Sequence, residues 1–135
     1  MIHFEKEHFQ KFRFSPSQIR RYFKSAKRDL EIAQKVDFAE VQFTFAYQAL
    51  IKLGIALLAK SGQVKVRSVP GHHAKILIKM SQLLNDDEVL AVGDLMRVKR
   101  NNDLYSAGIP VSQKETLEYV EFVRKVFKKA TACIL

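Results

Sequence analysis

The sequence has little cysteine, proline or glycine, with 1, 3 and 5 of these residues in a chain of 135. The single cysteine, Cys133, excludes an intramolecular disulfide and a cysteine-based zinc site, and its apolar helical surroundings predict a small core residue. With no repeat and no low-complexity run, nothing indicates disorder. The first residues carry Glu5, Lys6 and Glu7 instead of an apolar run, so we expect no signal peptide and a cytoplasmic protein.

Motifs of common enzymes are also missing. There is no Gly-rich phosphate loop, no H-E-x-x-H and no serine in a nucleophile elbow. His72 and His73 are adjacent, so on a helix they point about 100° apart and chelate one metal poorly. His3 and His8 have no third ligand at a helical spacing, which predicts surface residues. We therefore expect no metal and no cofactor.

Positively charged residues outnumber negatively charged ones. Lys and Arg number 23 against 14 Asp and Glu, which gives a formal net charge of +9. This favours a polyanionic partner such as RNA, DNA or an acidic protein, without choosing among them. Residues 43–59 are apolar almost all round, but the run is too short for a membrane span and is interrupted by Gln48 and Lys52. It predicts the central helix of a bundle, with no membrane partner.

Start and stop signals divide the chain into helices. Ser15, Pro16 and Gln18 form a capping box at the start of the first helix. The expected N-caps of three later helices each have a glutamate three residues on: Asp37, Asn85 and Ser112. A further helix is expected over residues 72–84, after a loop at residues 63–71 that is a candidate functional loop. The predicted fold is all-α, an antiparallel up-and-down bundle of four to five helices.

The N-terminal segment carries four phenylalanines among charged residues: Phe4, Phe9, Phe12 and Phe14. Burying such a side chain gains roughly 1.5–3 kcal/mol, so this arm needs a groove on its own domain or on a partner subunit. Residues 12–14 alternate like a strand, but a single piece makes no sheet, and we expect none. The predicted domains are an aromatic arm at residues 1–14 and a helical bundle domain at residues 15–135.

The segment 97–108 is the strongest candidate for function. Arg97, Asn101 and Tyr105 are four residues apart and share one helix face, on which an anion or a nucleotide can bind. Gly108 is the expected residue after the helix end, and the cations before it oppose the negative end of the helix dipole. A solvated, well-capped helix end is the alternative interpretation.

Three motifs resemble HEPN domains, over about residues 17–130 of this chain. Arg100-Asn101-x-x-x-Tyr105 resembles the HEPN signature, which is Arg, a polar residue, a few residues and then His. Ala46-Tyr47-Gln48-Ala49-x-x-Lys52 is similar to the second helix of the family. Gly71-His72-His73-x-x-x-Leu77 resembles the start of the family's next helix. The order of the three motifs also agrees with the family.

The resemblance implies metal-independent RNA cleavage at a dimer interface. Carried over, Arg100 holds the scissile phosphate and Asn101 is the adjacent polar residue, while Tyr105 stands where the family has His. A tyrosine pKa near ~10, against ~6.5 for histidine, makes a poor proton carrier at neutral pH. The residues implied in catalysis are Arg100, Asn101 and Tyr105, and those expected to bind phosphate are Arg97, Arg100, Arg20, Lys24 and Arg28.

Three hypotheses follow. The first is a non-catalytic HEPN-like module that dimerises and binds RNA, a nucleotide or a partner protein, such as the nucleotidyltransferase of a toxin–antitoxin pair. The second is a HEPN endoribonuclease toxin in which Tyr105 or His72 replaces the usual His. The third is a structural homodimer whose charge serves solubility.

Three structural expectations accompany these hypotheses. The excess of apolar surface predicts a homodimer. We expect the cations of the first helix to lie on the same side as Arg97 and Arg100. Arg100 and Tyr105 should share a partly exposed cleft, and the nearest acids in sequence for Arg100 are Asp94 and Asp103.

Overall fold

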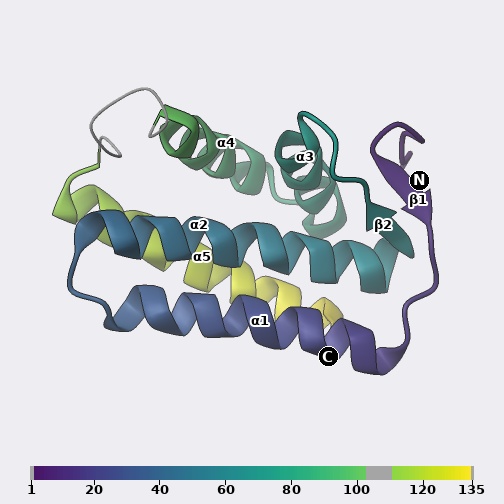
Figure 1. The fold of residues 1–135 in the computed structure, drawn as a ribbon, viewed down its shortest axis with the longest axis horizontal. Coiled ribbons are helices and arrows are strands. Elements are labelled where there is room, and N and C mark those ends of the chain that lie inside the picture. Colours follow the sequence, from purple (N-terminus) through teal and green to yellow (C-terminus); the bar gives the residue numbers. More distant parts are fainter. Residues whose placement is uncertain (1, 103–110, 135) are drawn as a thin grey trace.

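The computed structural model describes residues 2–102 and 111–134 and contains helices and one small ribbon of strands. The helices are α1 (Pro16–Lys35), α2 (Ala39–Leu57), α3 (His72–Leu84), α4 (Asp87–Asn102) and α5 (Gln113–Ile134). A π-helical turn, η1 (Leu58–Gly62), continues α2, and the strands are β1 (Phe9–Lys11) and β2 (Val64–Val66). The all-α bundle is confirmed (Figure 1).

Helix α2 is the centre of the bundle. It packs against α1 and α5 on one side and against α3 and α4 on the other (Figure 1). Its fully buried side chains include Phe43, Leu50, Leu53 and Leu57. By length and composition alone, Ala39–Gly62 is apolar enough to cross a membrane, but 67% of its most apolar window is buried inside the protein, as in a core helix. The other helices of the same chain therefore cover the apolar surface of α2, which was one of the reasons to expect a second subunit.

Two of the N-terminal helix caps are those that the sequence predicts, and α3 has the predicted bounds. Gln18 N donates to Ser15 Oγ at 3.1 Å and Ser15 N donates to Gln18 Oε1 at 2.8 Å, which completes the capping box of α1. Glu115 N donates to Ser112 Oγ at 3.1 Å at the start of α5. Both motifs lie within four residues, so local chemistry was enough to place them.

The other two predicted caps are wrong. Helix α2 begins one residue later than expected. Its N-cap is Phe38, whose side chain makes no capping hydrogen bond, so Asp37 has no capping role. At α4 the capping oxygen belongs to Asp86, whose Oδ1 accepts from Glu88 N at 3.0 Å. Asn85 instead ends α3 in the left-handed conformation, with φ of 50°. Asn tolerates that conformation better than most residues, and this favours it at a helix end over the next helix's cap.

The N-terminal arm forms a sheet, contrary to the prediction. β1 pairs with β2 in antiparallel register, with Phe9 opposite Val66 and Lys11 opposite Val64. Phe9 and Val64 are buried against the bundle. The partner strand lies more than fifty residues further on, within the segment that the sequence predicted as a loop, so local patterns gave no sign of the pairing.

A buried lysine fastens this arm to the bundle. Lys79 on α3 is 4% exposed, and its ammonium group lies 3.0 Å from Glu5 Oε1 and also donates to the carbonyl of His3. The same group lies 5.7 Å from the ring centre of Phe4 and 6.0 Å from that of Phe9, which adds cation–π attraction. The groove that the aromatic arm requires is therefore on its own domain.

A second ion pair, with a buried carboxylate and a partly exposed lysine, joins α1 to α2. Asp29 is 1% exposed, and Lys52 Nζ lies 2.7 Å from its Oδ2. Lys52 also donates to Ser25 Oγ at 3.0 Å. Among the described residues neither oxygen of Asp29 has a hydrogen bond of good geometry, so this ion pair is the main compensation for burying the carboxylate.

Cys133 is exposed, and the prediction of a core cysteine is wrong. The buried stripe of α5 passes through Ala130 and Ile134. Cys133 is three residues after Ala130 but directly before Ile134, and it falls on the outer edge of that stripe.

Candidate functional site

A half-open pocket of about 450 Å³ lies where the loop before α3 meets the end of α4. Its lining combines this loop, the first turn of α3 and two polar side chains of α4: Ser68, Val69, Pro70, Gly71, His72, His73, Ala74, Arg97 and Asn101. The predicted functional loop and the predicted binding helix therefore meet at one place. Arg97 and Asn101, four residues apart, point to the same side, as the helical spacing predicted.

The loop is shaped by Gly71, the N-cap residue of α3. Its φ is +81°, in the left-handed region that a side chain disfavours, although a Cβ would meet no neighbouring atom there. The turn brings the N-terminal end of α3 to the pocket, and the first turn of this helix carries no acidic residue. The positive end of the helix dipole thus adds to the charge of Arg97, which favours an anion.

His72 is held in one tautomer. Its Nδ1 lies 2.8 Å from the carbonyl oxygen of Val69. A carbonyl oxygen can only accept, so Nδ1 carries the proton and the neutral ring keeps the lone pair of Nε2. His72 is partly exposed in the pocket, where that lone pair can accept a proton from a bound group.

Behind His72, a tyrosine and a second histidine form a pair that the sequence analysis did not assign to the site. Tyr47 Oη lies 2.9 Å from His73 Nδ1. Burial raises the pKa of the Tyr47 phenol, partly offset by Arg97 and Arg100. Burial also lowers the pKa of His73, and His72, Arg100 and Arg97 lower it further. Both groups are therefore neutral at pH 7.

The available signal for this pair was a tyrosine within the mostly apolar central helix. Tyr47 is 2% exposed, and a buried tyrosine hydroxyl needs a hydrogen-bond partner. The sequence could not identify His73 as that partner, because the two residues are 26 positions apart.

Arg97 is paired with an acid of its own helix. Its Nε lies 2.7 Å from Asp94 Oδ1, and its side chain is 28% exposed. Asp94 is one of the two acids nearest to Arg100 in sequence, and the structure pairs it with Arg97, because residues three apart on a helix are neighbours. The other candidate acid, Asp103, lies outside the described residues.

The remaining residues of the HEPN-like motif are placed only in part. Arg100 is partly exposed and does not belong to the described lining of the pocket, although it lies close enough to shift the pKa of His73 and Tyr47. Tyr105 and Gly108 lie outside the described residues. The predicted cleft shared by Arg100 and Tyr105 stays a prediction.

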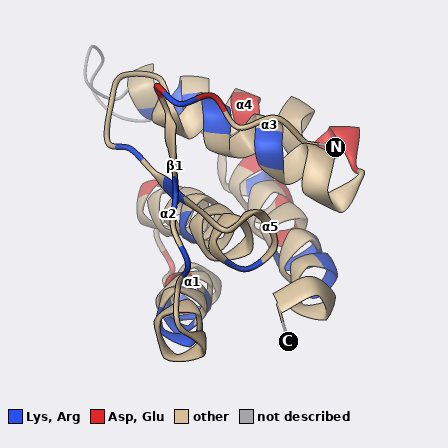
Figure 2. Ribbon diagram, turned by 90° about the vertical axis from the view of Figure 1, so that its right-hand side faces the viewer, with Lys and Arg blue, Asp and Glu red and all other residues tan. Residues whose placement is uncertain are grey.

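The cations of α1 lie elsewhere. Arg20, Lys24 and Arg28 are exposed, but α1 and α4 lie on opposite sides of α2 (Figures 1 and 2). The prediction of one positive surface shared by these residues and Arg97 is therefore wrong. Amphipathic spacing predicts which face of a helix is solvated, but it does not predict where that helix sits in the bundle.

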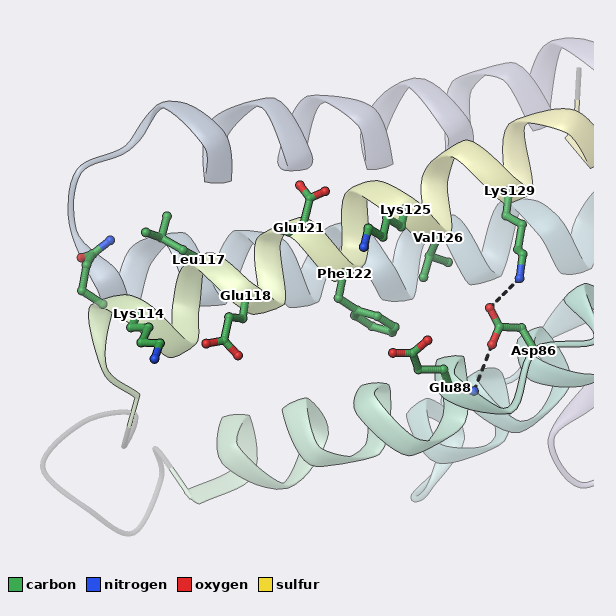
Figure 3. A pocket seen from close by; sticks show the side chains of 11 residues that line it. Asp86, Glu88, Lys114, Leu117, Glu118, Glu121, Phe122, Lys125, Val126 and Lys129 are labelled. Carbon is green, nitrogen blue, oxygen red and sulfur yellow. Dashed lines mark hydrogen bonds and ion pairs between the residues drawn. The ribbon is translucent and has the colours of Figure 1, made fainter.

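A further pocket of about 1080 Å³ lies between α4 and α5 (Figure 3). Phe122 points from α5 into this space, and Glu88 faces it from the start of α4 (Figure 3). Asp86 Oδ2 lies 2.7 Å from Lys129 Nζ at one end of the pocket. Its charged lining is of mixed sign, and none of the site residues expected from the sequence belongs to it.

Chemically, the pocket at α3 and α4 offers an arginine, an amide, a helix N-terminus and a histidine with a defined proton acceptor. These groups can bind a phosphate and accept a proton. Among the described residues, no three His, Cys, Asp or Glu side chains are grouped so as to hold a metal ion. Comparison of the chain with protein-family models, with curated proteins and with solved structures finds no match.

Proposed function

We propose that this chain is a HEPN-like helical module that binds RNA or a nucleotide in the pocket between α3 and α4. The observation that carries the proposal is the convergence of Arg97, Asn101 and His72 at the N-terminus of α3. In this proposal the protein acts as a cytoplasmic homodimer, and the nucleotidyltransferase of a toxin–antitoxin pair is its protein partner.

The pocket favours a phosphate over other small ligands for an electrostatic reason. A phosphate can accept from the guanidinium of Arg97 and from the amide of Asn101 while it lies at the positive end of the α3 dipole. Asp94 neutralises part of the charge of Arg97, which tunes the affinity and leaves the geometry of the site in place. The neutral Tyr47–His73 pair forms the uncharged back of the site.

A binding measurement with nucleoside monophosphates and short RNA tests this proposal. Arg97→Ala should weaken binding by about 1.5–3 kcal/mol, the value of a charge-assisted hydrogen bond. Asp94→Asn should have the opposite effect, because it frees the guanidinium for the ligand.

Arg124 is a matched control for these variants. Its guanidinium lies 2.7 Å from Glu121 in an ion pair of the same i,i+3 spacing, on α5. Arg124→Ala should leave the affinity unchanged. If Arg97→Ala and Arg124→Ala bind equally well, the pocket is not the binding site.

A second candidate function, metal-independent RNA cleavage, is favoured by the tautomer of His72. With Nδ1 donating to Val69, Nε2 can take the proton of a 2′-hydroxyl while that oxygen attacks the adjacent phosphorus. The bond from phosphorus to the 5′-oxygen then breaks, the leaving oxygen gains a proton from water, and a 2′,3′-cyclic phosphate forms. Arg97 would stabilise the charge that develops on the phosphate oxygens.

RNA incubated with the protein in EDTA, followed by analysis of its ends, tests this second function. Cyclic phosphate ends that form with the wild-type protein should disappear with His72→Gln, while RNA binding persists. His3→Gln is the control, because His3 is exposed and outside the pocket. Cleavage that continues in His72→Gln would remove His72 from the mechanism.

A further inference from the structure

The two-stranded ribbon has an outer face of distinct chemistry. Register and alternation place Phe9 and Val64 on the buried face, so Gln10 and Lys65 belong to the opposite face. Two further hydrogen bonds extend the pairing, from Phe12 N to Gln63 O at 3.0 Å and from Arg67 N to His8 O at 2.8 Å. The outer face therefore presents four side chains to solvent: Gln10, Phe12, Lys65 and Arg67.

This end of the molecule carries positive charge. A half-open pocket of about 1030 Å³ borders the ribbon, and the Lys and Arg side chains that line it are Lys6, Lys11, Arg13 and Arg67. Among the described residues, no Asp or Glu lines it. Figure 2 views this end and shows Lys and Arg along β1. The acids of the preceding turn are Glu5, which is engaged with Lys79, and the exposed Glu7.

Aromatic rings are interleaved with these cations. Phe12 is 39% exposed, and Lys65 Nζ lies 5.9 Å from its ring centre. The ring of Phe12 is followed by that of Phe14 at 4.6 Å, and Phe14 by that of Tyr22 on α1 at 5.5 Å. Tyr22 is 36% exposed, so this row of rings is open to solvent at both ends.

Exposed aromatic rings beside cations are the features by which proteins bind single-stranded nucleic acid. Bases stack on the rings whatever their sequence, while Lys and Arg follow the phosphates. A duplex hides the faces of its bases, and an acidic protein has no bases to stack. The combination of Phe12 with Lys65 and Arg67 therefore fits a single strand better than either alternative.

We propose that the outer face of the ribbon binds single-stranded nucleic acid. Arg67 lines the pocket at the ribbon, and Ser68, the next residue, lines the pocket at α3 and α4. A strand with one phosphate at Arg97 can therefore continue along residues 67–71 onto the ribbon. In this respect the inference rests on the proposed function and specifies its substrate as a single strand several nucleotides long.

Fluorescence anisotropy with the full chain tests the inference. The probes are labelled oligouridine and oligodeoxythymidine of roughly 12 nucleotides, a length within the usual site sizes, and an RNA duplex of equal length. Phe12→Ala should weaken single-strand binding about tenfold, and Phe12→Tyr should restore it, because the ring is what stacks. Lys65→Gln should reduce the slope of log affinity against log salt by about 0.7, the value for one phosphate of a single strand.

Phe38 is the matched control. It is 61% exposed and lies between α1 and α2, at the end of the molecule opposite the ribbon (Figure 1). Phe38→Ala should leave binding unchanged. Equal affinity of Phe12→Ala and Phe38→Ala, or a duplex bound as tightly as the single strand, would overturn the inference. The RNA and DNA arms report which strand is preferred.

A short probe separates this inference from the proposed function. Uridine monophosphate is expected to occupy the pocket at α3 and α4 alone, so Arg97→Ala should weaken its binding roughly tenfold or more, and Phe12→Ala should not affect it. If Arg97→Ala acts as expected while Phe12→Ala leaves oligouridine binding intact, binding at the ribbon is contradicted and binding in the pocket at α3 and α4 is supported. The converse result would leave the ribbon as the binding surface and remove the pocket.

Discussion

His73 is a histidine whose charge the fold suppresses, and this gives a prediction about pH. Its pKa is lowered from the ordinary value of 6.5, first by burial and then by the neighbouring His72, Arg100 and Arg97. The unfolded chain therefore takes up this proton at a higher pH than the folded chain does. The contribution of neutral His73 to stability is full above pH 6.5 and is lost as the pH falls through 6.5 towards the lowered value.

Urea unfolding and NMR titration check this sign. The free energy of unfolding should decrease as the pH is lowered from about 7.5 to about 5.5. His73→Gln should make it depend less on pH. The ring protons of His73 should titrate with a pKa below 6.5. A His73 that titrates above 6.5 would contradict the assigned environment.

Asp29 gives a second prediction at the scale of single residues. Lys52→Met removes the nearest counter-charge of this buried carboxylate and leaves only the exposed Arg28, at 3.8 Å, which should destabilise the protein by about 3 kcal/mol. The double variant Asp29→Leu with Lys52→Met should recover most of that loss, because apolar replacement of a buried ion pair is often neutral. Lys27→Met, at an exposed position of α1, is the control. Denaturant unfolding of the four proteins measures all of these differences.

At the scale of elements, the sequence was enough to predict features whose hydrogen bonds join residues only a few positions apart. The caps at Ser15 and Ser112 are of this kind, since each hydrogen bond joins residues three apart. The ribbon could not be predicted, because the stability of a short strand depends on a partner that the local sequence does not contain. Val64–Val66 has only three residues, and its pairing with the arm brings together segments separated by two helices.

The attachment of the arm through Lys79 gives a prediction for the ribbon as a unit. Lys79→Met keeps the aliphatic chain but removes the ion pair with Glu5 and the bond to the carbonyl of His3. Hydrogen exchange in residues 2–11 should become faster, while exchange in α2 stays slow.

Lys75→Met is the control for this change. Lys75 lies 4.0 Å from the same carboxylate but is 32% exposed, so its loss should have little effect. Unchanged exchange in Lys79→Met would mean that the apolar contacts of Phe4 and Phe9 hold the arm without the lysine.

At the scale of the whole molecule, the candidate site could be predicted only in part. The spacing of Arg97 and Asn101 was enough to predict a shared face, and the turn at Gly71 predicted the start of the next helix. What brings these two segments together is the packing of α3 against α4, with Tyr47 of α2 beneath them. The prediction that the cations of α1 share a surface with Arg97 failed for the same reason, since no local pattern specifies which side of α2 a helix occupies.

The surface between α4 and α5 gives the last prediction, a homodimer. Large apolar side chains are exposed on both helices. On α4, Leu95 is 58% and Val98 44% exposed, and on α5, Leu117, which lines the pocket of Figure 3, is 52% exposed. Large apolar side chains that stay exposed can mark an interaction site. The pocket also carries acids and lysines together, and a surface of mixed charge can pair with a second copy of itself across a two-fold axis.

Light scattering at tens of micromolar, a concentration on the order of ordinary affinities, should therefore give the mass of a dimer. Leu95→Glu combined with Leu117→Glu should give a monomer, because charge at the centre of an interface opposes its burial. Phe38→Glu changes an equally exposed side chain that lies outside this pocket, and it should leave the dimer intact. A wild-type monomer would contradict the dimer itself, whereas dissociation by Phe38→Glu alone would move the interface to the end where α1 meets α2.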